Sequence, residues 1–143
     1  MTRREVFEFI RSESLAVFGS VSPEGRPQSA LVGIAVTEDL EIVFDTLRST
    51  RKFRNIQNNP AASFVIGCTR EITVQLEGLA RELSPAGGEL ARYQQVYFSK
   101  WPDGPARLSW EGITYIAVKP TWIRFSDYLA SPPRIGEIET NPG

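Results

Sequence analysis

The sequence contains no histidine and only one cysteine among its 143 residues. The absence of histidine removes the commonest zinc ligand and the usual general base near neutral pH, so Ser-His-Asp and Cys-His catalysis are excluded. A lone cysteine, Cys68, excludes an internal disulfide and a multi-cysteine metal site, and we predict no metal. Because Cys68 ends the apolar run 63–68, we expect it to be a small core residue and not a nucleophile.

Long apolar runs and an excess of charge of one sign are also missing. No stretch of about 18 apolar residues occurs. Residues 1–5 lead directly into an amphipathic helix without a signal-peptide pattern. Because 16 Lys+Arg stand against 17 Asp+Glu, the formal net charge is −1. We therefore expect a cytoplasmic protein without membrane or nucleic-acid partners, in which any anion site is local. The length favours a single domain, residues 1–143.

The hydrophobic pattern is mainly that of β-strands. Alternating and continuous apolar runs predict about seven strands, at residues 15–21, 28–37, 40–46, 61–68, 71–83, 112–118 and 121–127. Two or three short helices accompany them, at residues 2–12, 50–59 and 89–99. Hairpin links without repeated βα alternation favour an α+β fold, predominantly antiparallel β, closed as a barrel. Residues 131–143 lack periodicity and are predicted to be an irregular tail.

The stretch from residue 45 to residue 60 has the pattern strand, turn and helix. Ser49 stands where a helix N-cap is expected, and Asn58-Asn59-Pro60 ends the helix about ten residues later. The chain has no G-x-G-x-x-G and no Walker loop, so phosphate recognition of the dinucleotide-fold or P-loop kind is not predicted.

The charges of this helix lie at its unfavourable end. Arg48, Arg51 and Lys52 crowd the N-terminus, where the helix dipole is positive and cations are normally disfavoured. Free backbone N–H groups, the hydroxyls of Ser49 and Thr50 and these cations together describe a site for a phosphate dianion. The alternative is a solvated basic helix face.

Five segments follow one another along residues 2 to 128: Gly25-Arg26-Pro27-Gln28-Ser29, Ile42-Val43-Phe44-Asp45-Thr46, Ser49-Thr50-Arg51-Lys52, Val74 to Ala80, and a final strand pair around Ile116 to Pro120 and Ile123 to Phe125. Their order and spacing resemble the pyridoxamine 5'-phosphate oxidase-like FMN-binding split-barrel family. The resemblance implies a homodimeric split β-barrel with FMN held in grooves at the subunit interface.

The resemblance also implies cofactor-binding residues. Thr50, Arg51 and Lys52, beside Ser49, would bind the FMN phosphate, which agrees with the charge pattern. The other implied residues would lie along the isoalloxazine and ribityl parts or reach the cofactor of the other subunit: Ser29, Ala30, Leu31, Asp45, Thr46, Gln75, Trp122 and Arg124. Alternatives remain for three of them, because Gln75 could be an ordinary exposed glutamine and Trp122 and Arg124 could be packing or dimer contacts. Trp101 and Trp110 are expected to be packing residues.

Two segments depart from the pyridoxamine 5'-phosphate oxidases themselves. Those enzymes resemble one another in an Arg-x-Val-Leu-Leu-Lys-type strand and an Arg-Leu-x-Pro-type C-terminal segment, whereas this chain has Gln-Ser-Ala-Leu-Val-Gly at 28–33 and Ser-Pro-Pro-Arg-Ile-Gly at 131–136. The departures argue against vitamin B6 oxidation. The resemblance implies an FMN-dependent oxidoreductase acting on a small molecule, with no nameable catalytic base. A deazaflavin-dependent reductase and a non-catalytic flavin-binding or stress-type module are the alternatives.

Overall fold

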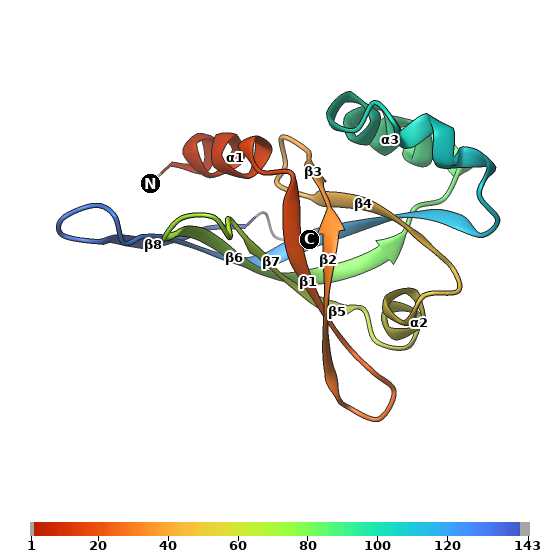
Figure 1. Ribbon diagram of the computed structural model, residues 1–143, viewed down its shortest axis with the longest axis horizontal. Coiled ribbons are helices and arrows are strands. Elements are labelled where there is room, and N and C mark those ends of the chain that lie inside the picture. The colour runs from red at the N-terminus through yellow and green to blue at the C-terminus, as the bar shows by residue number, and fades with distance from the viewer. Residues whose placement is uncertain (1, 141–143) are drawn as a thin grey trace.

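The computed structural model describes residues 2–140, whose strands form one curled antiparallel sheet (Figure 1). The sheet order is β2-β1-β5-β6-β7-β4-β3, and β8 pairs with β7. The strand bounds are β1 Leu15–Val21, β2 Pro27–Gly33, β3 Ala35–Val36, β4 Ile42–Leu47, β5 Ala61–Ile66, β6 Ile72–Glu82, β7 Ile113–Asp127 and β8 Arg134–Ile138. With a few short helices beside this half-barrel, the fold is an α+β split barrel, as predicted.

Three α-helices accompany the sheet in the described chain: α1 (Arg3–Ser12), α2 (Arg51–Asn58) and α3 (Glu89–Lys100). Two short 3₁₀ helices, η1 (Ala86–Gly88) and η2 (Gly104–Ser109), flank α3. No helix within residues 2–140 has the length and apolar character needed to cross a bilayer. In the view of Figure 1, α1 and α3 lie above the strands and α2 lies below β4.

Two hydrophobic clusters hold these layers together. The first fills the barrel and includes three phenylalanines from three strands, Phe18, Phe44 and Phe64, with ring centroids 4.9, 5.2 and 6.1 Å apart. Apolar residues of α1 and α2 join this cluster. The second lies under α3 and contains Tyr93 and Tyr97, so these two aromatic residues of that helix are core residues.

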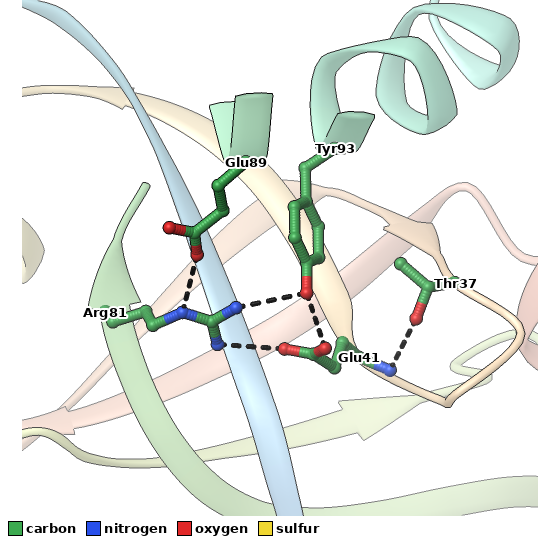
Figure 2. A network of polar contacts seen from close by, with 5 residues as sticks. All are labelled: Thr37, Glu41, Arg81, Glu89 and Tyr93. Atoms are coloured by element: carbon green, nitrogen blue, oxygen red, sulfur yellow. Dashed lines mark hydrogen bonds and ion pairs between the residues drawn. The ribbon is translucent and has the colours of Figure 1, made fainter. Parts of the chain in front are cut away.

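A polar network fixes α3 to the sheet edge (Figure 2). The Arg81 guanidinium on β6 donates to Glu41 at 2.9 Å, to Glu89 at 3.0 Å and to the Tyr93 hydroxyl at 3.0 Å. The Tyr93 hydroxyl in turn donates to Glu41. Because Glu89 and Tyr93 come from α3, whereas Arg81 comes from β6 and Glu41 directly precedes β4, the network holds the start of α3 against these two strands.

The two strands predicted at 112–118 and 121–127 are one strand, β7. Its first half pairs with β4, and its second half pairs with β8. Pro120 has no backbone N–H to donate to a neighbouring strand, so in the sequence it resembles the end of a strand. In the structure a β-bulge opposite Glu77 and Gly78 accommodates it, so the strand continues.

Three further expectations were wrong. The tail is not wholly irregular, because Arg134–Ile138 pairs with β7 and Ile138 packs against the core. The strand predicted at 28–37 is broken at Ile34, where the chain leaves β1 and pairs with β4 instead. Cys68 is exposed, because β5 ends at Ile66 and Gly67 turns the chain with a φ of +94°. Residues 141–143 of the predicted tail lie outside the described residues.

Candidate functional site

A cavity of about 560 Å³ opens at the N-terminus of α2. One wall comes from the β1–β2 hairpin and the other from the turn between β4 and α2. The lining residues are Ser20, Gln28, Ser29, Ala30, Ser49, Thr50, Arg51 and Lys52. The structure thus brings together the predicted phosphate residues and two residues of the strand predicted to run along the cofactor.

Thr50, not Ser49, is the N-cap of α2. Thr50 has extended backbone angles (φ −77°, ψ 155°), and its Oγ1 accepts from the Phe53 N–H at 3.4 Å. The same hydroxyl donates to the Leu47 carbonyl at 2.8 Å and lies 3.1 Å from Thr46 Oγ1. Thr46 is buried behind the cap. Ser49 is exposed on the rim of the cavity, and its hydroxyl forms none of the hydrogen bonds found within residues 2–140. The Ser49 hydroxyl is therefore the one that a ligand can use.

Arg48 is turned away from the cavity. Its guanidinium forms an ion pair with Glu82 at 2.7 Å and lies 5.9 Å from the centre of the Phe53 ring. The sequence placed three cations at this helix end, and the structure leaves two of them, Arg51 and Lys52, on the cavity wall.

Lys52 carries a charge that its surroundings do not fully compensate. Partial burial lowers the pKa of its ammonium group, and the nearby Asp45 carboxylate raises it by less. Asp45 is itself bound by Arg107 at 2.8 Å and by the Tyr97 hydroxyl at 3.0 Å. Among the ion pairs of residues 2–140, none includes Lys52 or Arg51. A desolvated cation beside an open helix N-terminus is suited to an anionic ligand.

Replacing Lys52 by methionine is expected to stabilise the ligand-free protein at pH 7. A lowered pKa means that the folded state binds the proton less tightly than the unfolded state, so protonated Lys52 opposes folding below its folded pKa. This cost disappears as the pH rises toward the ordinary value of 10.5. Urea unfolding should therefore give a higher free energy of unfolding for Lys52→Met than for wild type at pH 7. The difference between the two proteins should be smaller at pH 10. Lys119→Met is the control, and a less stable Lys52→Met protein at pH 7 would contradict the burial argument.

The remaining predicted residues lie elsewhere. Leu31, Gln75 and Arg124 belong to one row across the outer face of the sheet, in which Val17 and Val65 stand between them. Leu31 is 64% exposed. This row lies outside the lining of the phosphate cavity in the same chain.

Two other predicted side chains also have defined places. Trp122 is half-buried and opposite Glu77 in the register of β6 and β7, on the same outer face. Asp45, held by Arg107 and Tyr97, faces the α3 side of the sheet and is not part of the cavity lining. Trp101 packs under α3, as predicted, and donates to the Ile34 carbonyl at 2.9 Å, whereas Trp110 is 54% exposed, so its prediction as a packing residue was wrong.

A second hollow of about 440 Å³ adjoins the phosphate cavity. The two share Ser20, Gln28 and Ser29, and the second extends over Ser63 and Glu77 on the outer face. Together they form a groove that starts at the α2 N-terminus and crosses the β1–β2 hairpin. Such a groove can hold an elongated ligand with a phosphate at one end.

A protein-family model described as "Pyridoxamine 5'-phosphate oxidase" matches residues 2–127. The chain belongs to the pyridoxamine 5'-phosphate oxidase family. This assignment confirms the resemblance found in the sequence motifs.

The individual relatives of this family member have low sequence identity to it. It is 31% identical over 94 residues to a pyridoxine/pyridoxamine 5'-phosphate oxidase from Bacteroides thetaiotaomicron, an alignment covering 65% of this chain and 41% of that protein. A heme-binding protein from Mycobacterium smegmatis has a similar structure, with a TM-score of 0.81, 18% identity and coverage of 97% of this chain and 58% of that one. An F420 reductase matches with a TM-score of 0.65 and 22% identity over 81% of this chain and 93% of its own. These two structural likenesses show the fold alone.

Three residues that shape the cavity were not predicted from the sequence of this family member. Ser20 and Gln28 line it, and Asn55 lies behind it on α2. Asn55 was detectable in principle, because it is a polar residue on the face of α2 that also carries Phe53 and Ile56. Ser20 and Gln28 come from strands far away in sequence, and no local pattern assigns them to a helix N-terminus.

Proposed function

We propose that this chain is an FMN-dependent oxidoreductase that holds the flavin phosphate at the N-terminus of α2. The observation that carries the proposal is the pair Arg51 and Lys52, which line the cavity without a carboxylate partner in the described ion pairs. Phosphate oxygens would accept from the Arg51 guanidinium, the Lys52 ammonium, the Ser49 hydroxyl and the first backbone N–H groups of α2.

The rest of the flavin is proposed to follow β2. This strand ends the sheet order, so its second edge has no strand partner within residues 2–140. Backbone N–H and C=O groups along Ser29, Ala30 and Leu31 can therefore bond the polar edge of a ring. The adjoining groove supplies the length that the ribityl chain and ring require.

Bound flavin supplies hydride transfer, which agrees with a chain that has no histidine and no nameable base. The protein's own part is to fix the phosphate, orient the ring edge on β2 and leave one ring face open to a small substrate. The departures at 28–33 and 131–136 argue for a substrate other than a B6 vitamer.

Turnover distinguishes the oxidoreductase from a binding module. The protein loaded with FMN should oxidise a reduced nicotinamide in the presence of an artificial electron acceptor, and Arg51→Ala should lose this activity in proportion to lost flavin. Stoichiometric FMN binding without turnover of either nicotinamide would favour a flavin-binding module. Binding and turnover with a deazaflavin in place of FMN would assign the chain to the other reductase class.

We also propose that a second copy of the chain completes the site. Four large apolar side chains are exposed on the outer face of the sheet, one on each of the neighbouring strands β2, β1, β5 and β6. They are Leu31 (64% exposed), Leu15 (48%), Val65 (39%) and Leu79 (52%). Several large exposed apolar side chains on one face commonly mark a protein interface. Gln75, Trp122 and Arg124 share this face, and in a dimer they can approach the cofactor of the other subunit.

Val65→Glu is expected to separate the dimer and weaken FMN binding. Val65 stands at the centre of the row that joins Leu31 to Arg124, so a carboxylate there would be buried against the second copy without a partner. Light scattering after gel filtration should give a wild-type mass of about twice 16.0 kDa and a variant mass of about 16.0 kDa. Thr69→Glu, in the exposed β5–β6 turn, is the control. A monomeric wild-type protein that binds FMN would contradict the interface.

A further inference from the structure

A buried asparagine behind the phosphate cavity requires an explanation. Asn55 is 3% exposed on the inner face of α2, between Phe53 and Ile56. Burying an amide without hydrogen-bond partners is unfavourable, so the contacts of this side chain matter for the folded state. Its side-chain amide lies 3.0 Å from Ser20 Oγ and 2.6 Å from the Gln28 amide. Both partners come from the β1–β2 hairpin and line the cavity.

The other end of the Gln28 amide faces Arg51. With its oxygen on that side, Gln28 accepts from Arg51 Nε at 3.2 Å and from Nη2. Arginine offers only N–H donors, so this orientation is the one that satisfies both groups. The Gln28 nitrogen then faces the Asn55 amide at 2.6 Å, so Asn55 would have to turn its oxygen toward Gln28 to accept this bond. In this arrangement Arg51 Nε and Nη2 donate to the Gln28 oxygen, and the Gln28 nitrogen is held on the Asn55 side.

We propose that Gln28, held by Asn55 and Ser20, is a positioning residue that orients Arg51 for the cofactor phosphate. The inference rests on the proposed function for its ligand, but the contacts that carry it lie within the chain. Arg51 is otherwise an exposed side chain at the first turn of α2. A free arginine loses rotamer entropy when it binds, and a bond that fixes Nε and one Nη beforehand removes part of that loss.

The arrangement should also affect flavins with and without a phosphate differently. The edge of Arg51 that faces Gln28 is occupied, and the remaining N–H groups are free to meet a phosphate oxygen. A flavin without a phosphate does not use Arg51 at all. Positioning by Gln28 should therefore strengthen FMN binding and leave riboflavin binding unchanged, which a general structural role would not do.

Gln28→Met tests this directly, because methionine keeps the unbranched shape and loses the hydrogen bonds to Arg51 and to Asn55. FMN affinity should fall roughly five- to tenfold, and riboflavin affinity should stay within about twofold. In an Arg51→Ala background, Gln28→Met should change FMN affinity by less than about twofold, since its effect passes through Arg51. Equal losses for FMN and riboflavin, or an undiminished loss without Arg51, would overturn the proposal.

A second readout does not depend on flavin. In the ligand-free protein, the Arg51 Nε–H resonance, assigned by its loss in Arg51→Lys, should be separate from those of exposed arginines and should join them in Gln28→Met. An Arg51 resonance unmoved by Gln28→Met would overturn the proposal, even if FMN does not bind and the proposed function fails. If Gln28→Met does not fold, Gln28→Glu replaces it. Its carboxylate should keep the Arg51 resonance separate and still weaken FMN by repelling the phosphate.

Discussion

Replacing both Arg51 and Lys52 by alanine is expected to weaken FMN binding by about 3–6 kcal/mol, or about 1.5–3 kcal/mol for each charge-assisted hydrogen bond. The two side chains line the same cavity at the open end of α2. No carboxylate forms an ion pair with either of them in the described residues, so both cations are available to an anionic ligand. Titration of FMN fluorescence measures the loss, and the single variants show how nearly the two contributions add.

Arg48→Ala is the matched control for this pair. Arg48 belongs to the same basic cluster in sequence, but in the structure it is bound by Glu82 at 2.7 Å and points away from the cavity. Its exposed ion pair contributes about 0–1 kcal/mol to stability, and its loss should leave FMN affinity within about threefold of wild type. Wild-type affinity in both Arg51→Ala and Lys52→Ala, or an equal loss in Arg48→Ala, would contradict the phosphate assignment.

Phe18→Ala is expected to lower the free energy of unfolding by about 3–5 kcal/mol. Phe18 is 1% exposed and contacts both other phenylalanines of the barrel centre, with ring centroids 4.9 Å from Phe44 and 5.2 Å from Phe64. These rings come from β1, β4 and β5, so a cavity at this point loosens three strands at once. Urea unfolding should show the loss as a lower midpoint with an unchanged slope.

Phe9→Ala provides the comparison within the same core. Phe9 is half-buried on α1 and meets Phe125 edge-on at 5.9 Å, so its removal leaves a space that water can reach. Its cost should be clearly smaller than that of Phe18→Ala. Equal losses for the two variants would mean that the barrel centre is not the main source of stability.

Most strands could be predicted from the sequence because their alternation is local. In β6, Val74, Leu76 and Ala80 are buried while Gln75 and Glu77 are exposed, as the pattern indicated. The prediction failed where the extent of a strand depends on the strands with which it pairs. β7 reads as two strands because Pro120 resembles a strand break, and only its pairing with β6 shows that it continues; the five residues of β8 are too few to show a period.

The site was predictable to the same extent. The cluster of cations at a helix N-terminus is a local signal, and Arg51 and Lys52 do line a cavity there. Two adjacent hydroxyl residues can both serve as N-cap, and only the backbone angles select Thr50 over Ser49. The withdrawal of Arg48 depends on Glu82, 34 positions along the chain, which no local pattern contains.

The most direct test of FMN binding is the visible absorption spectrum of the protein purified without added cofactor, repeated after incubation with FMN and gel filtration. We predict a flavin band that stays with the protein at about one FMN per subunit and is absent from the Arg51→Ala, Lys52→Ala double variant. A wild-type protein that leaves the column colourless after incubation with FMN would contradict the account.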